Sequence, residues 1–186
     1  MGNDGERSEK EKMLAGEFYR AGDPELTADR YRAERLLRAY NSADTDKERT
    51  TIVRELLGFV GEDVVLRPPF YCDYGYNIRV GSGVFVNLGC VFLDVASINI
   101  GNFCQIGSYV QILTADHPRN PASRRQGLEF GRPISVGENV WIGSGAIIRP
   151  GVTVGDDAII GAGSVVTRDV LRGATVVGNP ARARST

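Results

Sequence analysis

The chain has 186 residues, of which 42% are hydrophobic and 24% are charged, enough for one folded unit with a core of its own. Its 22 basic and 23 acidic side chains leave a formal net charge of −1, which argues against binding to nucleic acid or to an anionic membrane. The first residues, MGNDGERSEKEK, lack the apolar core of a signal peptide, and no apolar run approaches the ~20 residues of a membrane span. We therefore expect a cytoplasmic protein with small or neutral partners.

Residues 1–62 are predicted to form a helical lead. In a first helix, Met13, Leu14 and Phe18 would share one face, and Gly16 would weaken that helix by ~1 kcal/mol relative to alanine. Two further amphipathic helices, rich in arginine and glutamate on their solvated sides, are expected before the lead ends.

A segment rich in proline, glycine and aromatic residues follows, with the sequence LRPPFYCDYGYN over residues 66–77. We expect it to be extended at its proline pair and too irregular to belong to a regular coil. Asp73 lies in this segment, where it is either a turn residue or a ligand contact.

Residues 136–170 repeat a pattern of six residues, VGENVW, IGSGAI, IRPGVT, VGDDAI, IGAGSV and VTRDV. Each hexad begins with an aliphatic anchor, and the residue four places later is small. The anchors are Val136, Ile142, Ile148, Val154, Ile160 and Val166, and the small residues are Val140, Ala146, Val152, Ala158, Ser164 and Val170.

A period of six matches neither a helix nor an ordinary strand. Three hexads that each form a short strand and a turn would close one triangular coil, with anchors and small residues inside, and such coils bury their faces by stacking. The sequence therefore predicts a mainly β fold, a parallel β-helix over residues 63–186. The glycine that often follows an anchor suits a corner where φ is positive.

The cysteines Cys72, Cys90 and Cys104 are odd in number and form no CxxC pair, which disfavours a disulfide framework or a zinc site. Two of them, Cys90 and Cys104, stand four places after the anchors Val86 and Ile100. We expect these two to be small buried packing residues.

The repeat is interrupted by a polar loop over residues 114–133, which contains the only histidine, His117. Long insertions in compact folds are usually functional or disordered. This loop could cover a neighbouring subunit and so place His117 in a cleft between protomers. Histidine can transfer protons near neutral pH, although an ordinary loop histidine remains the alternative. One histidine per chain also argues against a three-histidine zinc site, so no metal is expected.

Two other residues depart from the logic of the repeat. Trp141 stands five places after an anchor and is predicted to lie outside the prism, where it covers either a partner subunit or a ligand. Asn87 stands directly after an anchor, where it either takes a left-handed turn conformation or contacts a ligand.

Several stretches resemble the maltose and galactoside O-acetyltransferases, and the MLAGE stretch in the lead is most similar to the maltose branch. They are KEKMLAGEFYRAGDPEL, PPFYCDYGYNI, the run from Phe85 to Val95, TADHP, the hexads of residues 136–170 and GNPAR. The resemblance spans nearly the whole chain. It implies a left-handed coil, a homotrimer with active sites between subunits, and transfer of an acetyl group from acetyl coenzyme A to a sugar hydroxyl.

The resemblance also implies roles for individual residues. His117 would be the general base, and Glu129 a candidate for orienting its imidazole. Asp73 and Asn87 would contact the acceptor, with Asn87 also near the thioester. The positions that match coenzyme A contacts are Asn87, Trp141, Ser144, Ala162, Thr167, Arg168 and Arg182.

Two positions depart from the family pattern. Asp116 replaces a threonine before the histidine and adds a carboxylate beside the expected base, and Leu171-Arg172 stands where the family usually has proline. Two alternatives to a sugar O-acetyltransferase remain. The first is an acetyltransferase whose acceptor is an antibiotic or an oligosaccharide precursor, and the second is a hexapeptide-repeat scaffold without catalytic activity.

Overall fold

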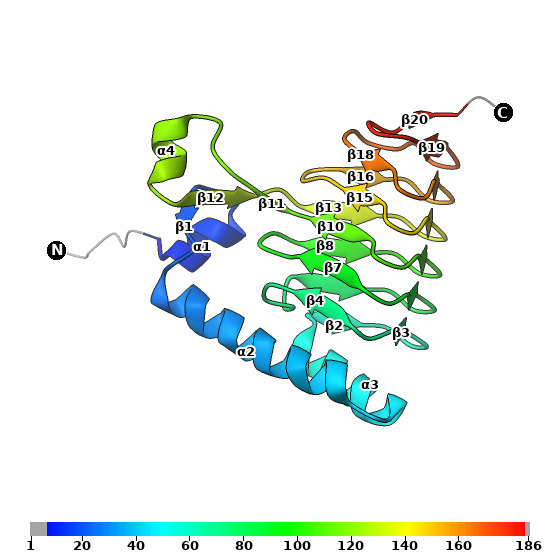
Figure 1. The fold of residues 1–186 in the computed structure, drawn as a ribbon, viewed down its shortest axis with the longest axis horizontal. Helices are drawn as coiled ribbons and strands as arrows, with labels where there is room; N and C mark the ends of the chain where they lie inside the picture. Colours follow the sequence, from blue (N-terminus) through cyan, green and yellow to red (C-terminus); the bar gives the residue numbers. More distant parts are fainter. Residues whose placement is uncertain (1–6, 185–186) are drawn as a thin grey trace.

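The computed structural model describes residues 7–184 of the chain. The first six residues, which carry part of the expectation about a signal peptide, lie outside this range. The described chain forms a parallel β-helix, with α2 and α3 beneath its first coil and a loop carrying α4 at its side (Figure 1). The predicted fold class is therefore confirmed.

The coil passes in turn through three parallel sheets, which we name after the strands of one coil. The β8 sheet consists of β2 (Phe59–Val60), β5 (Ile78–Val80), β8 (Ile98–Ile100), β13 (Ile134–Val136) and β16 (Thr153–Val154). The β9 sheet consists of β3 (Val65–Leu66), β6 (Phe85–Val86), β9 (Gln105–Ile106), β14 (Trp141–Ile142), β17 (Ile159–Ile160), β19 (Thr175–Val177) and the antiparallel β20 (Arg182–Ala183). The β10 sheet consists of β4 (Phe70–Cys72), β7 (Cys90–Leu93), β10 (Gln111–Leu113), β15 (Ile147–Ile148) and β18 (Val165–Val166).

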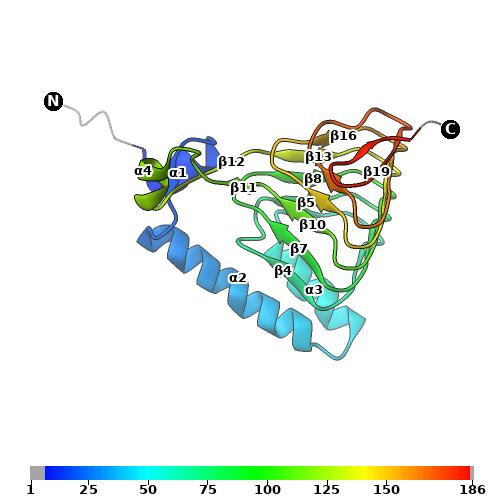
Figure 2. The ribbon, with the colours of Figure 1, turned by 45° about the horizontal axis from the view of Figure 1, so that its top comes forward.

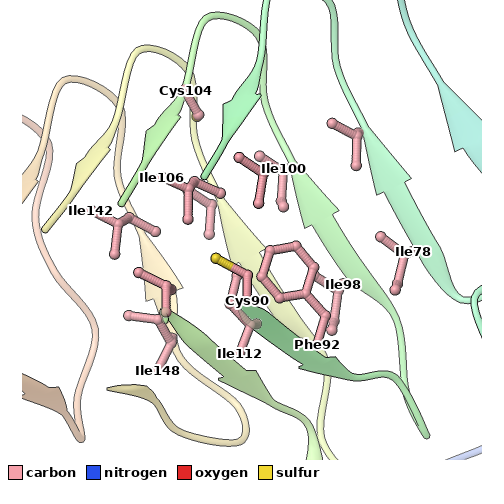
Figure 3. Close-up of a cluster of buried hydrophobic side chains, with 14 of the residues drawn as sticks. Ile78, Cys90, Phe92, Ile98, Ile100, Cys104, Ile106, Ile112, Ile142 and Ile148 are labelled. Carbon is pink, nitrogen blue, oxygen red and sulfur yellow. The ribbon is translucent and has the colours of Figure 1, made fainter. Parts of the chain in front are cut away.

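The anchors and small residues of the hexads fill the interior of the prism. Figure 3 shows Ile98, Ile106 and Ile112 pointing into the space between the three sheets. Cys90 and Cys104 are fully buried among them, as predicted, and their thiols donate to carbonyl oxygens of neighbouring coils. Because parallel strands in register place each anchor over the next, every coil covers the apolar face of its neighbour.

The glycines that follow the anchors have a different role from the predicted one. None of Gly101, Gly143 and Gly155 has a positive φ, and a Cβ on any of them would lie within 2.6 Å of the backbone of the next coil. Positive φ occurs two residues later in the turn, where it is taken by residues as different as Gly145 and Tyr109. Where glycine directly follows an anchor, it is therefore required by the close approach of the next coil. The residue two places later adopts positive φ, a conformation that glycine takes most easily.

The segment of residues 66–77 is more regular than expected, because β3 and β4 belong to the first coil. Its period of six is hidden at Phe70, a large residue where later coils have a small one. The Phe70 ring packs edge to face on Phe92 of the next coil, with ring centroids 5.1 Å apart. Large aromatic rings thus fill the interior of the first coils, where later coils have small residues.

Helix α1 (Glu9–Leu14) is shorter than predicted. Ser8 caps its N-terminus in a capping box with Glu11, and the chain leaves the helix through Gly16, whose φ is +73°. Met13 is buried, but Leu14 and Phe18 are about half exposed, so the predicted shared apolar face is wrong. Gly16 ends the helix and does not weaken its interior.

Helices α2 (Pro24–Ser42) and α3 (Asp46–Leu56) cover the open end of the prism. The Tyr40 hydroxyl donates to the Leu66 carbonyl, and the Asn41 side chain both donates to and accepts from the backbone of Phe70. These bonds satisfy polar groups of the first coil that no preceding coil can pair with.

The predicted loop protrudes from the coil and forms a small sheet with the lead. In it, β11 (Ala115–Asp116) pairs with β12 (Leu128–Gly131), and β12 pairs with β1 (Tyr19–Arg20), both antiparallel. Helix α4 (Pro121–Arg125) connects β11 to β12. Figure 2 shows α1, α4 and β12 together beside the prism, joined to it by β11.

The outer faces of the three sheets differ in polarity. The outward row of the β8 sheet is mostly polar, with Phe59, Arg79, Asn99, Ser135 and Thr153. The outward row of the β9 sheet is mostly apolar, with Val65, Phe85, Gln105, Trp141, Ile159 and Thr175. The outward row of the β10 sheet is likewise mostly apolar, with Tyr71, Val91, Gln111, Ile147 and Val165.

Candidate active site

His117 directly follows β11 and is exposed on the protruding loop. Its backbone is fixed on both sides: its N–H donates to Asp116 at 2.8 Å, and its carbonyl accepts from Arg119 at 2.9 Å. Asp116 and Arg119 form a bidentate pair at 2.8 and 2.9 Å. Burial alone would raise the pKa of Asp116, but the bonds from Arg119 and from the His117 N–H outweigh it and lower that pKa. Asp116, which stands where the family pattern has threonine, is thus paired with an arginine.

The small sheet brings the strand before His117 beside the strand that carries Glu129. Ala115 of β11 lies opposite Gly131 of β12, and Asp116 lies opposite Phe130. His117 is the next residue after Asp116, and Glu129 is the residue before Phe130. The predicted base therefore follows directly from a strand whose partner carries the predicted carboxylate.

Glu129 is held from its other side by Tyr19 of β1. The two residues are register partners, and the Tyr19 hydroxyl donates to Glu129 at 3.0 Å. Tyr19 is fully buried, and burial followed by the Glu129 charge raises its pKa, which keeps the hydroxyl protonated as a donor. The Tyr19–Glu129 bond thus joins the lead to the loop that carries the predicted base.

Asp73 directly follows β4 and lies close enough to Glu129 to feel its charge. Its backbone N–H donates at 3.0 Å to the buried carboxylate of Asp94, which also accepts from the backbone of Tyr74 and Asn77. Burial and the nearby charge of Glu129 raise the pKa of Asp73 to about 6, against the effect of Arg30. For Asp94, burial raises the pKa to about 7, while the backbone donors act in the opposite direction.

Asn87 does not adopt the left-handed conformation considered for it; Gly89 does, with φ +77°. The side-chain oxygen of Asn87 accepts from the backbone of Leu88 at 2.8 Å and from Arg67 at 3.2 Å. Its amide nitrogen has no bond of its own among residues 7–184, so it is available to a ligand.

Two of the residues expected to contact coenzyme A lie, like Asn87, at the border between the β9 sheet and the β10 sheet. Ser144 and Ala162 are exposed in the turns after β14 and β17, and the Gly163 N–H donates to the Ser144 carbonyl. Trp141 points outward from β14 and is 57% exposed, as its place in the hexad predicts. Arg182 lies on β20, exposed beyond the end of this border.

Thr167 and Arg168 follow β18 on the opposite border of the β10 sheet. Thr167, His117 and Arg149 share a cavity of about 400 Å³. Phe18 and Phe130, which pack edge to face, also line this cavity. Leu171 is 79% exposed, and the coil continues beyond it into β19, so the turn without proline does not end the stack.

The site residues therefore gather along two borders of the β10 sheet. All of its strands run in one direction, so Asp73, His117 and Thr167 follow its strands at the carboxyl edge. Asn87 and the turns of Ser144 and Ala162 precede its strands at the amino edge. Strands of two to four residues hold these edges on the order of 10 Å apart. A single chain does not bring His117 and Asn87 together.

Three residues of the candidate site were not identified from the sequence. Tyr19 meets Glu129 across 110 residues of chain, and no local pattern could reveal this pairing. Asp94 gave a weak signal, because a charged residue stands two places after the anchor Phe92. Arg149 gave none, since a charge in a turn is usually solvated.

Among residues 7–184, no helix is long and apolar enough to cross a bilayer. The same residues contain no group of three or more histidine, cysteine, aspartate or glutamate side chains placed to hold a metal ion.

Two family models match parts of the chain. Residues 12–61 match the maltose acetyltransferase hexapeptide capping motif, and residues 133–168 match the bacterial transferase hexapeptide model of six repeats. Nodulation protein L of Rhizobium meliloti (strain 1021) is 57% identical over 180 residues, which cover 96% of this chain and 98% of that protein.

Solved structures of similar proteins share the whole fold. A maltose O-acetyltransferase from Clostridium difficile 630 is 45% identical with a TM-score of 0.94, covering 96% of this chain and 97% of that one. A hexapeptide-repeat acetyltransferase from Vibrio cholerae O1 biovar eltor, complexed with acetyl coenzyme A, is 38% identical with a TM-score of 0.91, covering 97% and 98%. The chain therefore belongs to the maltose O-acetyltransferase family of hexapeptide-repeat acetyltransferases.

Proposed function

We propose that this protein transfers the acetyl group of acetyl coenzyme A to a hydroxyl group of a sugar, with His117 as the general base. One observation carries the proposal. The strand that precedes His117 pairs with the strand of Glu129, and the charge of Glu129 acts on Asp73, which supports a site in which the expected base and an expected acceptor contact share one edge. Similar proteins whose names specify maltose acetylation or whose structures hold acetyl coenzyme A support the donor and the acceptor class.

The mechanism follows from the chemistry of the groups. The imidazole of His117 takes the proton of the acceptor hydroxyl as its oxygen attacks the thioester carbonyl carbon, which avoids a free alkoxide. The tetrahedral intermediate collapses with cleavage of the carbon–sulfur bond, and the proton passes to the departing thiolate. Glu129, held by Tyr19, orients the imidazole and stabilises its positive charge. The products are an acetyl ester and free coenzyme A.

Most of the expected donor contacts lie at the amino edge, and Thr167 and Arg168 lie at the carboxyl edge. Trp141 flanks the pantetheine arm, and Ser144 and Ala162 contact it through their turns. Asn87 contacts the acceptor and reaches the thioester. Arg168 and Arg182 are exposed cations suited to the phosphates of coenzyme A, and Thr167 lies beside Arg168.

A homotrimer unites the two edges. The outward rows of the β9 and β10 sheets are largely apolar, and Trp141 and Tyr71 are about half exposed in the single chain. Burying these rows between subunits removes apolar surface from water. It also sets the amino edge of one copy against the carboxyl edge of the next, so that each site takes His117 from one chain and Asn87 from its neighbour. We expect this trimer to reside in the cytoplasm.

The test is a thiol-release assay with acetyl coenzyme A against glucosides, galactosides, maltose, antibiotics and simple alcohols. Wild-type protein should release thiol only with sugar acceptors. His117→Ala should lose about 10²–10⁴-fold in kcat while it keeps coenzyme affinity and the trimer mass. Arg79→Ala, on the polar outer face of the β8 sheet, is the control and should behave as wild type. Wild-type turnover in His117→Ala would refute the mechanism, and wild-type protein that neither binds coenzyme A nor transfers acetyl would favour the scaffold.

A further inference from the structure

One turn at the amino edge of the β10 sheet carries an aromatic residue where the neighbouring turns carry glycine. The third residue after each anchor there is Gly89, Tyr109, Gly145 or Gly163, and all four have positive φ, between +60° and +77°. A residue with a Cβ loses roughly 1–2 kcal/mol in this conformation relative to right-handed backbone. Tyr109 therefore occupies a position for which glycine is the better residue by backbone conformation alone.

The Tyr109 ring leans toward the turn of Asn87. A Cβ built on Gly89 would lie 2.5 Å from ring atoms of Tyr109, whereas a Cβ built on Gly145 would meet nothing within 4 Å. The ring thus covers the coil of Asn87 and leaves the coil of Ser144 open. Tyr109 is 63% exposed, and its hydroxyl makes no hydrogen bond within residues 7–184. An apolar ring face and a free hydroxyl are presented together beside Asn87.

Phe103 has the same geometry at another corner of the same coil. Its φ is also +60°, it is 59% exposed, and its ring lies 2.7 Å from a Cβ built on Gly83. Packing over a glycine explains both rings equally well. The two differ in place, because Phe103 stands between the β8 and β9 sheets, away from both edges that carry the site. Phe103 is therefore a matched control for Tyr109.

We infer that Tyr109 is an acceptor-binding residue, whose ring packs on the apolar face of the sugar and whose hydroxyl bonds to one of the sugar hydroxyls. The inference rests on the proposed function and on the expectation that Asn87 contacts the acceptor as well as the thioester. The direction of the ring favours contact with the acceptor. The ring leans toward the coil of Asn87, whereas Ser144 and Ala162, the expected donor contacts, lie in the coils on the other side of Tyr109. Aromatic side chains suit this task because they combine a rigid apolar surface with a polar tip.

The test compares three full-length variants by steady-state kinetics with both substrates. Tyr109→Gly restores the residue that neighbouring coils use, so it should fold, and Phe103→Gly makes the same change at the control corner. We expect Tyr109→Gly to raise the acceptor KM about fivefold or more and to leave the KM for acetyl coenzyme A unchanged. Tyr109→Phe should show a smaller rise, and Phe103→Gly should change neither KM.

Equal acceptor KM values in Tyr109→Gly and Phe103→Gly would overturn the inference. A rise confined to the KM for acetyl coenzyme A would also overturn it and make Tyr109 a donor contact. If only the Tyr109→Gly variant dissociates into monomers in analytical ultracentrifugation, Tyr109 is a subunit contact and the inference is wrong. Failure of the proposed function can be told apart from failure of this inference, because the wild-type protein would then transfer acetyl to no sugar.

Discussion

Replacing Gly101 with alanine tests whether close stacking, and not backbone conformation, requires glycine after an anchor. A Cβ at this position would lie 2.6 Å from both the carbonyl carbon and the carbonyl oxygen of Gly137 in the next coil. Ordinary contact begins near 3.4 Å, so the two coils would have to separate locally by about 0.8 Å. The Gly101 N–H donates to the Val136 carbonyl at 2.8 Å, and this bond would lengthen with them.

The expected loss follows from overpacking against rigid backbone. Inserting a methyl group where no side chain can yield typically removes about 1–3 kcal/mol of stability. For a chain of this length, 2 kcal/mol corresponds to a fall in the melting temperature of roughly 4–8 °C. Gly101 lies between the β8 and β9 sheets, so activity at low temperature should persist.

Two further glycines provide controls for Gly101→Ala. Gly22 has an ordinary φ and open space around its Cβ position, so Gly22→Ala should lose no stability. Gly163 has open space but a φ of +67°, so Gly163→Ala should lose about 1 kcal/mol through backbone strain alone. Thermal unfolding followed by circular dichroism, at one fixed protein concentration, ranks the three variants. The reasoning is wrong if Gly101→Ala melts together with Gly22→Ala.

Three further outcomes concern the site. Trp141→Ala should weaken coenzyme A binding about tenfold by calorimetry with little change in melting temperature, and an unchanged Kd would leave Trp141 a subunit contact. Tyr19→Phe should lower kcat roughly two- to tenfold and shift the pH profile of kcat, because Glu129 loses its hydroxyl donor, whereas an unaltered profile would contradict the positioning role. Asp73 becomes charged as pH rises through about 6, so the acceptor KM should fall between about pH 5 and pH 7, and Asp73→Asn should abolish that trend. Because this pKa lies above the ordinary 3.8, the same ionisation removes stability as pH rises, and stability that increased over this range would contradict the shift.

The interior of the prism could be predicted from the sequence because it depends on local period alone. A period of six assigns Ile142 and Ala146 to the inside and Trp141 to the outside without knowledge of any distant contact. The same rule failed in the first coil, where Phe70 occupies a small-residue position and Pro68 and Pro69 obscure the strand that follows. A large ring is tolerated there because Phe92 of the next coil packs against its edge.

The site itself was accessible from the sequence only in part. The position of His117 on an insertion was visible, but the partner of Glu129 was not, because β1 and β12 are far apart in the chain and pair in space. Strand pairing of this kind depends on tertiary packing, and two-residue strands carry too little pattern to reveal it. The role of the turn glycines also required coordinates, since a close approach between coils has no signature within one hexad.

The polar outer row of the β8 sheet has a practical consequence for spectroscopy. Thr153 is exposed on this row, outside the faces that we assign to subunit contact and to ligands. The native thiols Cys90 and Cys104 are fully buried, and burial raises the pKa of each to about 11. Burial also raises the pKa of the Cys72 thiol. A Thr153→Cys substitution would therefore react selectively with a maleimide dye and report on tumbling and assembly without a cysteine-free background.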